Sequence, residues 1–443
     1  MHPKKKTMKV LKFGGTSVGS AERMQHVADL ITDGQQKIVV LSAMSGTTNS
    51  LIQISDYAKR DNHAAAAEVL NELTRKYHLE IDALYATESC RNEALRRIEE
   101  FLNQLRKLYL MPIGEQVEKE IVAMGEQMST NMMTLLLQER GVKATLMPAL
   151  DFMCLDENGE PSLPLITEKL HAIWPSYKDY DIVITQGFIC RDHNGRISNL
   201  KRGGSDYSAS LIGAAIDADE IQIWTDIDGM HNNDPRFVAN TQPVPQLSFE
   251  EAAELAYFGA KILHPTCILP AKLKNIPVRL LNTLEPSAQG TTISNTFKQG
   301  KIEAVAAKDG ICAIRILSGR MLMAYGFLRQ MFEIFEKYRT SIDLITTSEV
   351  AVSLTIDNTD HLDSIVDELR NLGTVTVERN MVIISVVGDL NTQNVGYEAK
   401  VVDALKEIPV RMISYGGSDH NISILIRAED KTRALQALSD HLF

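Results

Sequence analysis

The chain has 443 residues, of which 44% are hydrophobic and 23% are charged. This is the composition of an ordinary globular protein, and the length fits about three domains. The 46 basic and 57 acidic residues give a net charge of -11, which argues against a nucleic-acid or membrane-surface partner because such partners require a basic face.

The five cysteines lie far apart and have no CxxC spacing. Neither a zinc site nor a disulfide framework is therefore expected, and a reducing cytoplasm is the expected location. No apolar run approaches the roughly 18 residues of a membrane span. The basic start of the chain is not followed by the apolar stretch of a signal peptide.

The first elements predict a βαβ unit. Residues 8–13 form a strand that ends in Gly14-Gly15, and residues 20–31 form a helix with Ser20 as its N-cap. The apolar run 37–42 has the composition of a strand that is covered on both faces.

The next segment, from 51 to 140, is helical in pattern almost throughout, with a break at Met111-Pro112. Further on, strands and helices alternate, which predicts an α/β fold with a mostly parallel sheet between helices. The strands are expected at 142–147, 181–186, 220–224 and 278–281, and the helices at 206–216 and 249–258.

A turn-rich stretch, 285–294, marks the candidate domain boundary. Beyond it, a helix, a loop, a strand, a turn and a second strand follow one another twice, first within 332–356 and again within 401–426. We interpret this as an internal repeat of a small α+β unit.

The segment 12–19, Lys-Phe-Gly-Gly-Thr-Ser-Val-Gly, is the most informative motif. Glycines at the end of a strand expose backbone N–H groups to a phosphate, and Lys12 adds a fixed positive charge. Alternatively, Gly14-Gly15 makes only a tight turn. The lysine precedes the glycines, so the segment is not a Walker A loop.

A second glycine pair, Gly203-Gly204, follows Arg202 and opens the helix predicted from Asp206. Arg202 can hold a carboxylate with two hydrogen bonds, and the helix start attracts an anion. Alternatively, Ser205 or Asp206 is the N-cap of that helix. Two such glycine pairs together indicate a cradle for phosphate or carboxylate groups.

Two further acidic positions have both a functional and a structural interpretation. Glu126, at the start of a helix predicted over 127–138, is either a ligand or a solvated charge, and Asp226, after a strand, is either a ligand or a loop cap. Lys261 is expected to supply a second cation for a triphosphate, and for His264 before Pro265 a structural role is favoured over a catalytic one. The chain has no HExxH, GxGxxG, HRD or DFG signature, which argues against the enzymes that those motifs define.

These segments, in this order, resemble aspartate kinases of the amino-acid kinase superfamily, most closely the lysine-inhibited, monofunctional type. The resemblance runs from about residue 8 to the C-terminus. It is carried by the segments 12–17, 41–49, 125–126, 186–189, 202–207, 224–229, 234–236, 259–265 and 342–350.

The resemblance implies a role for each matching residue. Lys12, Gly14 and Gly15 would hold the transferring phosphoryl group, with Asp206 and Lys261 completing the catalytic set. The aspartate pocket would comprise Ser42, Thr48, Glu126, Phe188, Arg202, Gly203, Gly204 and Ser205. ATP, with Mg²⁺ on its phosphates, would contact Lys12, Phe13, Gly14, Gly15, Thr225, Asp226, His231, Asp234, Arg236, Lys261 and Ile262. No protein-held metal site is implied.

The resemblance also implies the domain organisation and the regulation. Residues 1–298 would be the kinase domain, with a helical insertion at about 51–140. Residues 299–443 would be tandem ACT domains, the first at about 317–378 and the second at 299–316 with 379–443. An amino-acid effector, lysine, would bind at Met321, Ala324, Phe327, Leu328, Ser341, Ile342, Asp343, Ser348 and Glu349. The ACT domains would also join two chains into a homodimer.

The expected reaction is phosphoryl transfer from ATP to the side-chain carboxylate of L-aspartate, the entry step to lysine, threonine and methionine synthesis. Two alternatives remain open, namely a catalytically silent amino-acid sensor and a kinase of another acceptor. Departures from the family pattern at Lys201, His231, Ala324 and 416–421 bear on the nucleotide contact and on the identity of the effector.

Overall fold

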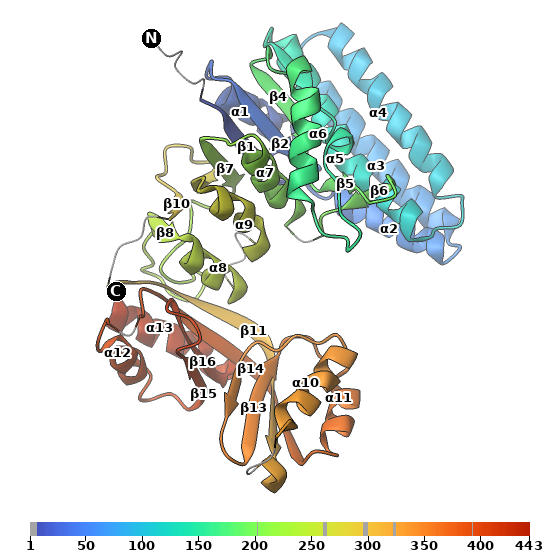
Figure 1. The fold of residues 1–443 in the computed structure, drawn as a ribbon. Coiled ribbons are helices and arrows are strands. Elements are labelled where there is room, and N and C mark those ends of the chain that lie inside the picture. The colour runs from blue at the N-terminus through green and yellow to red at the C-terminus, as the bar shows by residue number, and fades with distance from the viewer. Residues whose placement is uncertain (1–6, 202, 260–263, 296–299, 322–324, 392) are drawn as a thin grey trace. The chain divides into compact units, whose positions relative to one another are not determined.

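The computed structural model describes residues 7–201, 203–259, 264–295, 300–321, 325–391 and 393–443. By its internal contacts the chain divides into two units, Met1–Gly229 with Leu263–Asn295 and Met230–Ile262 with Thr296–Phe443 (Figure 1).

A mostly parallel sheet forms the centre of the first unit. Strands β2 and β4 are wholly buried along their length, as expected for strands covered on both faces. In spatial order the strands are β3 (Ala144–Leu146), β4 (Ile182–Gln186), β2 (Lys37–Leu41), β1 (Lys9–Phe13), β7 (Glu220–Thr225), β9 (Val278–Asn282) and the antiparallel β10 (Thr291–Ser294).

Helices cover both faces of this sheet. Leu11, Phe13, Val39 and Leu41 point to one face, where they share an apolar core with α1 (Ala21–Ile31) and the helices of the 47–139 segment. Those helices are α2 (Thr47–Lys59), α3 (His63–Leu84), α4 (Glu88–Leu108) and α5 (Glu115–Glu139). Side chains alternate along a strand, so Lys12 points to the other face of the sheet, where it pairs with Asp206 of α7 (Gly204–Ala215). Helices α6 (Leu163–Ile173) and α9 (Pro265–Lys274) pack against α7.

The predicted α/β class and mostly parallel sheet are confirmed, and so is Ser20, whose side chain accepts a hydrogen bond from the backbone of Arg23. The sequence interpretation missed α6, α9 and a hairpin of β5 (Ile189–Arg191) and β6 (Ile197–Asn199). Helix α9 contains Pro270, and a proline within a sequence pattern usually indicates that a helix ends there. The segment 285–294 is not turn throughout, because its last residues form β10.

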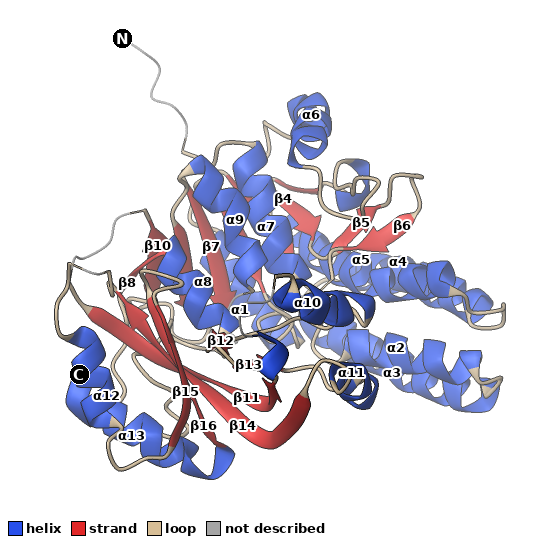
Figure 2. Ribbon diagram, turned by 60° about the horizontal axis from the view of Figure 1, so that its bottom comes forward, coloured by secondary structure: helices blue, strands red, loops and turns tan. Residues whose placement is uncertain are grey.

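The second unit contains an antiparallel sheet in the order β12-β13-β11-β14-β16-β15. Two long strands, β11 (Ile302–Leu317) and β14 (Thr374–Gly388), pair with each other and carry the shorter strands at either side (Figure 2). The shorter strands are β12 (Ile345–Thr347), β13 (Ala351–Ile356), β15 (Val410–Tyr415) and β16 (Asn421–Arg427).

The internal repeat is visible in this sheet, because each half has its own helices and its own apolar core. Helices α10 (Phe327–Lys337) and α11 (Leu362–Leu369) belong to the first half. Helices α12 (Tyr397–Ala404) and α13 (Lys431–Leu442) belong to the second half. Short 3₁₀ turns also occur in both units, at Ala149–Asp151, Trp174–Ser176, Gly319–Met321 and Ala428–Asp430. The bounds that the sequence analysis gave for the kinase and ACT domains stay predictions.

Helix α8 (Phe249–Tyr257), which follows β8 (Gln246–Ser248), is bonded to both halves of this sheet. Glu254 accepts a hydrogen bond from Asn421 at 2.9 Å, and the Tyr257 hydroxyl donates to Asp343 at 2.8 Å. Gly259 has φ +120°, and a Cβ there would meet the Ala307 carbonyl oxygen at 2.1 Å. Residues 249–259 therefore pack closely on the C-terminal sheet.

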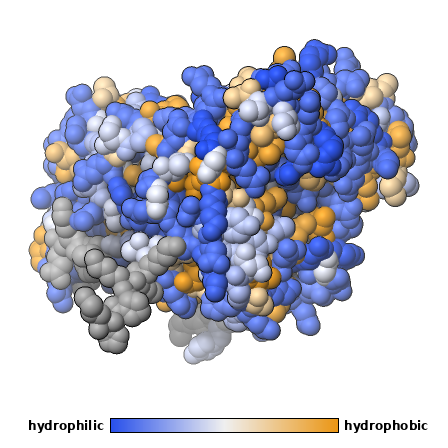
Figure 3. All heavy atoms as spheres, turned by 90° about the horizontal axis from the view of Figure 1, so that it is seen from above, coloured by the Kyte–Doolittle hydropathy of each residue, from blue (hydrophilic) through white to orange (hydrophobic). Residues whose placement is uncertain are grey.

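In the part of the chain that the structure describes, no helix is long and apolar enough to cross a membrane. Hydrophilic residues predominate on the face shown in Figure 3, with hydrophobic residues scattered among them.

Candidate active site

Four neighbouring parallel strands end side by side and place their following residues in a row. Backbone bonds continue past the strand ends, from Gly187 to Leu41 at 2.9 Å, from Ser42 to Phe13 at 3.2 Å and from Gly14 to Trp224 at 3.4 Å. Phe188, Ser42, Gly14 and Thr225 thus lie at the carboxyl ends of β4, β2, β1 and β7. Ligands of open α/β sheets bind at this edge.

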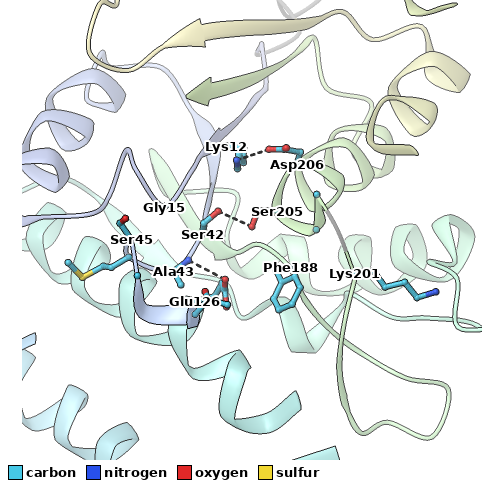
Figure 4. A pocket seen from close by; sticks show the side chains of 15 residues that line it. Lys12, Gly15, Ser42, Ala43, Ser45, Glu126, Phe188, Lys201, Ser205 and Asp206 are labelled. Carbon is cyan, nitrogen blue, oxygen red and sulfur yellow. Dashed lines mark hydrogen bonds and ion pairs between the residues drawn. The ribbon is translucent and has the colours of Figure 1, made fainter. Parts of the chain in front are cut away.

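A cavity of about 400 Å³ opens at this edge (Figure 4). Its walls come from several segments of the first unit, namely the end of β1, residues 42–48 after β2, the middle of α5, the turn after β4, and the start of α7 with Lys201 just before it. The lining residues are Lys12, Gly15, Ser42, Ala43, Met44, Ser45, Gly46, Thr48, Glu126, Phe188, Lys201, Gly203, Gly204, Ser205 and Asp206.

Lys12 and Asp206 form an ion pair in this cavity, with Nζ 2.7 Å from Oδ1. Only 9% of Lys12 is exposed, so the carboxylate offsets the cost of burying the ammonium group. A Cβ on Gly14 would lie 3.4 Å from Nζ, and one on Gly15 would lie 2.9 Å from the Ala43 carbonyl oxygen. The two glycines therefore permit close approach at this point, beyond making a turn.

The start of α7 faces the cavity without a side-chain cap. Its N-cap is Gly203, at φ +67°, so the alternative that Ser205 or Asp206 is the N-cap is wrong. Ser42 instead donates a hydrogen bond to the Ser205 hydroxyl at 2.9 Å. Exposed N–H groups at a helix start attract an anion.

Glycines again allow close packing between the start of α7 and the turn after β4. A Cβ on Gly204 would meet the Phe188 ring at 2.6 Å, and one on Gly187 would meet the Ser205 side chain at 2.6 Å. Phe188 itself has φ +66°, a conformation that costs energy for a bulky residue. The turn therefore holds the Phe188 ring at the cavity wall.

Glu126 is 4% exposed and lies in the middle of α5, so both its prediction at a helix start and the alternative of a solvated charge are wrong. Its Oε1 accepts a hydrogen bond from the Ala43 backbone N–H at 3.2 Å, whereas its Oε2 has no hydrogen-bond partner among the described residues. Burial raises the pKa of Glu126 to about 7. A buried carboxylate oxygen without a partner favours a cationic ligand.

The residues predicted for the nucleotide are divided between the two units. In the first unit, the Thr225 hydroxyl donates to Asp226 at 3.1 Å at the end of β7. In the second unit, His231 is bonded to Thr241 at 3.0 Å and Arg236 is bonded to Asp234 through two atoms, at 3.0 and 2.6 Å. Lys261, Ile262 and the substrate-binding candidate Arg202 lie outside the described residues.

Of the residues predicted for the effector, those that the structure describes lie around the first half of the second sheet. Met321, Phe327 and Ile342 pack into its apolar core, whereas Leu328, Ser341, Ser348 and Glu349 are exposed. The Asp343 side chain is fully buried and accepts hydrogen bonds from Lys308 at 2.6 Å and Tyr257 at 2.8 Å. Ala324 lies outside the described residues.

The sequence interpretation missed five residues of the cavity lining, namely Ala43, Met44, Ser45, Gly46 and Lys201. The motif 41–49 contained four of them, but only Ser42 and Thr48 were singled out. Within the described residues, no group of three or more His, Cys, Asp or Glu side chains could hold a metal ion.

Comparison with known proteins identifies the class. The model of the amino acid kinase family matches residues 7–282, and that of an ACT domain matches residues 384–442. Together with the cavity at the sheet edge, these matches define an amino acid kinase that is followed by an ACT region.

Relatives are similar over nearly the whole chain. Aspartokinase 1 of Arabidopsis thaliana chloroplasts is 36% identical over 98% of this chain and 80% of the relative. Lysine-sensitive aspartokinase 3 of Escherichia coli is 33% identical over 98% of this chain and 99% of the relative. The crystal structure of E. coli aspartokinase III with aspartate and ADP matches with a TM-score of 0.84 over 98% of this chain and 100% of that one, at 33% identity. The chain belongs to the aspartokinase family, which confirms the resemblance seen in the sequence.

Proposed function

We propose that this protein transfers the γ-phosphoryl group of ATP to the side-chain carboxylate of L-aspartate, giving ADP and 4-phospho-L-aspartate. A carboxylate oxygen attacks the phosphorus atom as the bond to the β–γ bridging oxygen breaks. The carboxylate is already ionised, so the reaction needs no general base. Catalysis then depends on positioning and on neutralising charge.

The observation that carries the proposal is the Glu126 carboxylate oxygen that has no hydrogen-bond partner among the described residues, in the same cavity as the Lys12–Asp206 pair. An amino-acid substrate brings an ammonium group, which would occupy the free side of Glu126. The negative charge that develops on the phosphoryl oxygens would meet Lys12 and the N–H groups after β1. One cavity thus offers an anion for the ammonium and a cation for the phosphoryl group.

The remaining substrate contacts follow from the lining of the cavity. Ser42, Thr48 and Ser205 would form the polar lining around the aspartate, with Ser42 orienting the Ser205 hydroxyl, and Phe188 would close the pocket. The α-carboxylate would lie at the start of α7, with Gly203 and Gly204 permitting its approach and Arg202 binding it. Asp206 would hold Lys12 toward the phosphoryl group, and Lys261 would add charge on the nucleotide side.

The residues proposed to contact ATP are Phe13, Thr225, Asp226, His231, Asp234, Arg236 and Ile262. Mg²⁺ would arrive on the phosphate oxygens and neutralise part of their charge. Mg²⁺ is usually held by one or two carboxylates together with substrate phosphates. Asp226, exposed at the end of β7, is a carboxylate that could join it.

The regulation proposed here is inhibition by lysine at the first ACT repeat, with Asp343 binding its ammonium group. The similarity to a lysine-sensitive relative supports this. A homodimer through the ACT region is also proposed, because Leu328, Phe332 and Val350 leave apolar surface exposed on the first repeat. The reaction would be the first step of lysine, threonine and methionine synthesis.

The test is ADP release by the purified protein with ATP, Mg²⁺ and L-aspartate, repeated with millimolar lysine and separately with threonine. Turnover that requires aspartate and falls with lysine supports the whole proposal. Turnover unaffected by lysine contradicts the effector alone. Absence of aspartate-dependent turnover contradicts the reaction and favours a silent sensor, while turnover with another amino acid favours a different acceptor.

A further inference from the structure

The 42–48 loop, defined here as the connection between β2 and α2 together with the first two residues of α2, forms a large part of the cavity wall. It contains Ser42 and Thr48, both proposed to bind aspartate. Its own turn is made at Gly46, with φ +80°. The position of this loop therefore sets the position of the substrate.

Helix α5 holds the first half of the loop. Ser129 donates a hydrogen bond to the Ser42 carbonyl oxygen at 2.8 Å, and the Ala43 backbone donates to Glu126 at 3.2 Å. The close packing at Gly125, where a Cβ would lie 2.8 Å from the Ala43 Cβ, fixes the distance between helix and loop.

Helix α3 holds the second half of the loop from outside the cavity. The Lys76 ammonium group donates a hydrogen bond to the Ser45 carbonyl oxygen. The Tyr77 hydroxyl lies 3.2 Å from the Thr47 hydroxyl, and Tyr77 is fully buried. One turn further along α3, Glu80 accepts from the Ala21 backbone N–H at 2.6 Å, at the start of α1.

Neither Lys76 nor Tyr77 lines the cavity, so neither is placed to contact the substrate. Their partners, Ser45 and Thr47, nevertheless lie in the same loop as Ser42 and Ala43, which are bonded to α5. The loop is thus fixed at residues 42, 43, 45 and 47 by two helices of the insertion.

We infer that Lys76 and Tyr77 are positioning residues of the aspartate pocket, acting through the 42–48 loop. This inference rests on the function proposed above. A misplaced substrate reacts more slowly and binds less well, so releasing the loop would weaken aspartate binding and spare ATP binding. The helical insertion would then be part of the substrate site, beyond its contribution to the core.

The first test compares two tyrosines of the same region. Tyr77→Phe removes the hydroxyl bonded to Thr47, whereas Tyr85→Phe removes the buried hydroxyl at the end of α3 that donates to Met132 at 2.8 Å. Each variant loses one buried hydrogen bond, so similar losses of stability are expected. Only Tyr77→Phe should raise the KM for aspartate, about three- to tenfold, the equivalent of one hydrogen bond, with the KM for ATP unchanged.

The second test uses Lys76. Lys76→Met should raise the KM for aspartate. Lys76→Arg should leave this KM near the wild-type value, because arginine can still donate to the Ser45 carbonyl oxygen. A wild-type KM for aspartate in Tyr77→Phe and Lys76→Met would overturn the inference. An equal change in Tyr85→Phe would also overturn it, because it would show a general loss of packing.

Hydrogen exchange separates this inference from the proposed reaction. Amide protons of the peptide 42–48 should exchange faster in Tyr77→Phe than in the wild type, and at the wild-type rate in Tyr85→Phe. Unchanged exchange in Tyr77→Phe would overturn the positioning role even if the protein did not turn over aspartate. Absent turnover with the expected exchange would instead contradict the proposed function alone.

Discussion

Lys12, on the central strand β1, and Asp206, in the first turn of α7, form an ion pair of 2.7 Å in the wall of the candidate active site. The pair connects the sheet to the helix whose start faces the cavity. Because both side chains are largely buried, each determines where the other lies. Lys12 is therefore held in a fixed position by the protein itself.

Lys12→Met should reduce kcat by about 10²–10³-fold, the usual cost of losing one group that stabilises charge in a transition state. Asp206→Asn should reduce kcat less, since the amide can still accept a hydrogen bond from Lys12. Initial rates with saturating ATP and aspartate measure both. Lys9→Met is the matched control, because Lys9 lies on the same strand in a more exposed ion pair with Glu220, at 3.5 Å. Equal losses in Lys9→Met and Lys12→Met would contradict the assignment.

Glu126 should make aspartate binding depend on pH near neutrality. Burial raises its pKa to about 7, so the carboxyl is increasingly protonated as the pH falls below that value. The protonated form cannot attract an ammonium group, and the KM for aspartate should therefore rise as the pH falls from 8 to 6. Glu126→Gln should raise the KM and remove this dependence. A KM for aspartate that stays constant from pH 8 to 6 in the wild type would contradict the role.

The raised pKa of Glu126 also makes the stability of the folded protein depend on pH. Aspartate binding should strengthen as the pH rises, whereas stability should fall. A carboxyl whose folded pKa exceeds its unfolded value of 4.5 binds more protons when folded, so stability falls as the pH rises through this window. The cost of the buried charge above pH 7 is about 3 kcal/mol by the usual conversion. Glu126→Gln should therefore raise the Tm at pH 8 more than at pH 5, measured without substrate. A lowered Tm at pH 8 would contradict this.

Gly125→Ala tests the close packing between α5 and the 42–48 loop. The new Cβ would lie 2.8 Å from the Ala43 Cβ and 3.4 Å from a Thr47 methyl carbon. Such overpacking costs about 1–3 kcal/mol, and it should also raise the KM for aspartate by displacing the loop. Gly114→Ala, at the N-cap of the same helix with no atom within 4 Å of the added Cβ, is the control. Wild-type stability and a wild-type KM for aspartate in Gly125→Ala would contradict this prediction. The loop would then move aside for the added methyl group without a cost in free energy.

The features that the sequence predicted well are local ones. The β1 strand, the Ser20 cap and the glycine pair after β1 depend on residues within a few positions of one another. The burial of Glu126 depends on Ala43, 83 residues away, and a glutamate in a helix offers no sign of it. Gly125 is the nearest signal, since a glycine in mid-helix costs stability and so indicates close packing.

Strand β11 was not among the predicted elements, for a related reason. Lys308-Asp309-Gly310 reads as a turn, yet the strand continues through it. Gly310 has φ +77°, and the register against β14 shifts between Lys308 and Ile311. The segment is therefore a bulge, stabilised by long-range pairing with β14 that the local pattern does not contain.

Asp343 should be required for the proposed lysine inhibition. Burial raises its pKa, although the Lys308 ammonium group, 2.6 Å away, opposes this effect. Lys308 also lies 3.0 Å from Asp357, so an effector ammonium would share or replace Lys308 as the partner of Asp343. Because asparagine carries no charge, Asp343→Asn should increase the lysine concentration for half-inhibition by about tenfold or more, the equivalent of one charged hydrogen bond.

Asp357→Asn is the matched control for this prediction, because it removes a second carboxylate from the same lysine but is not among the proposed effector residues. Its half-inhibition concentration should change much less than that of Asp343→Asn. Both are measured as the ratio of ADP release with and without lysine, which cancels differences in basal rate. A larger change in Asp357→Asn would show that the charge of Lys308, and not the carboxylate of Asp343, governs the response to lysine.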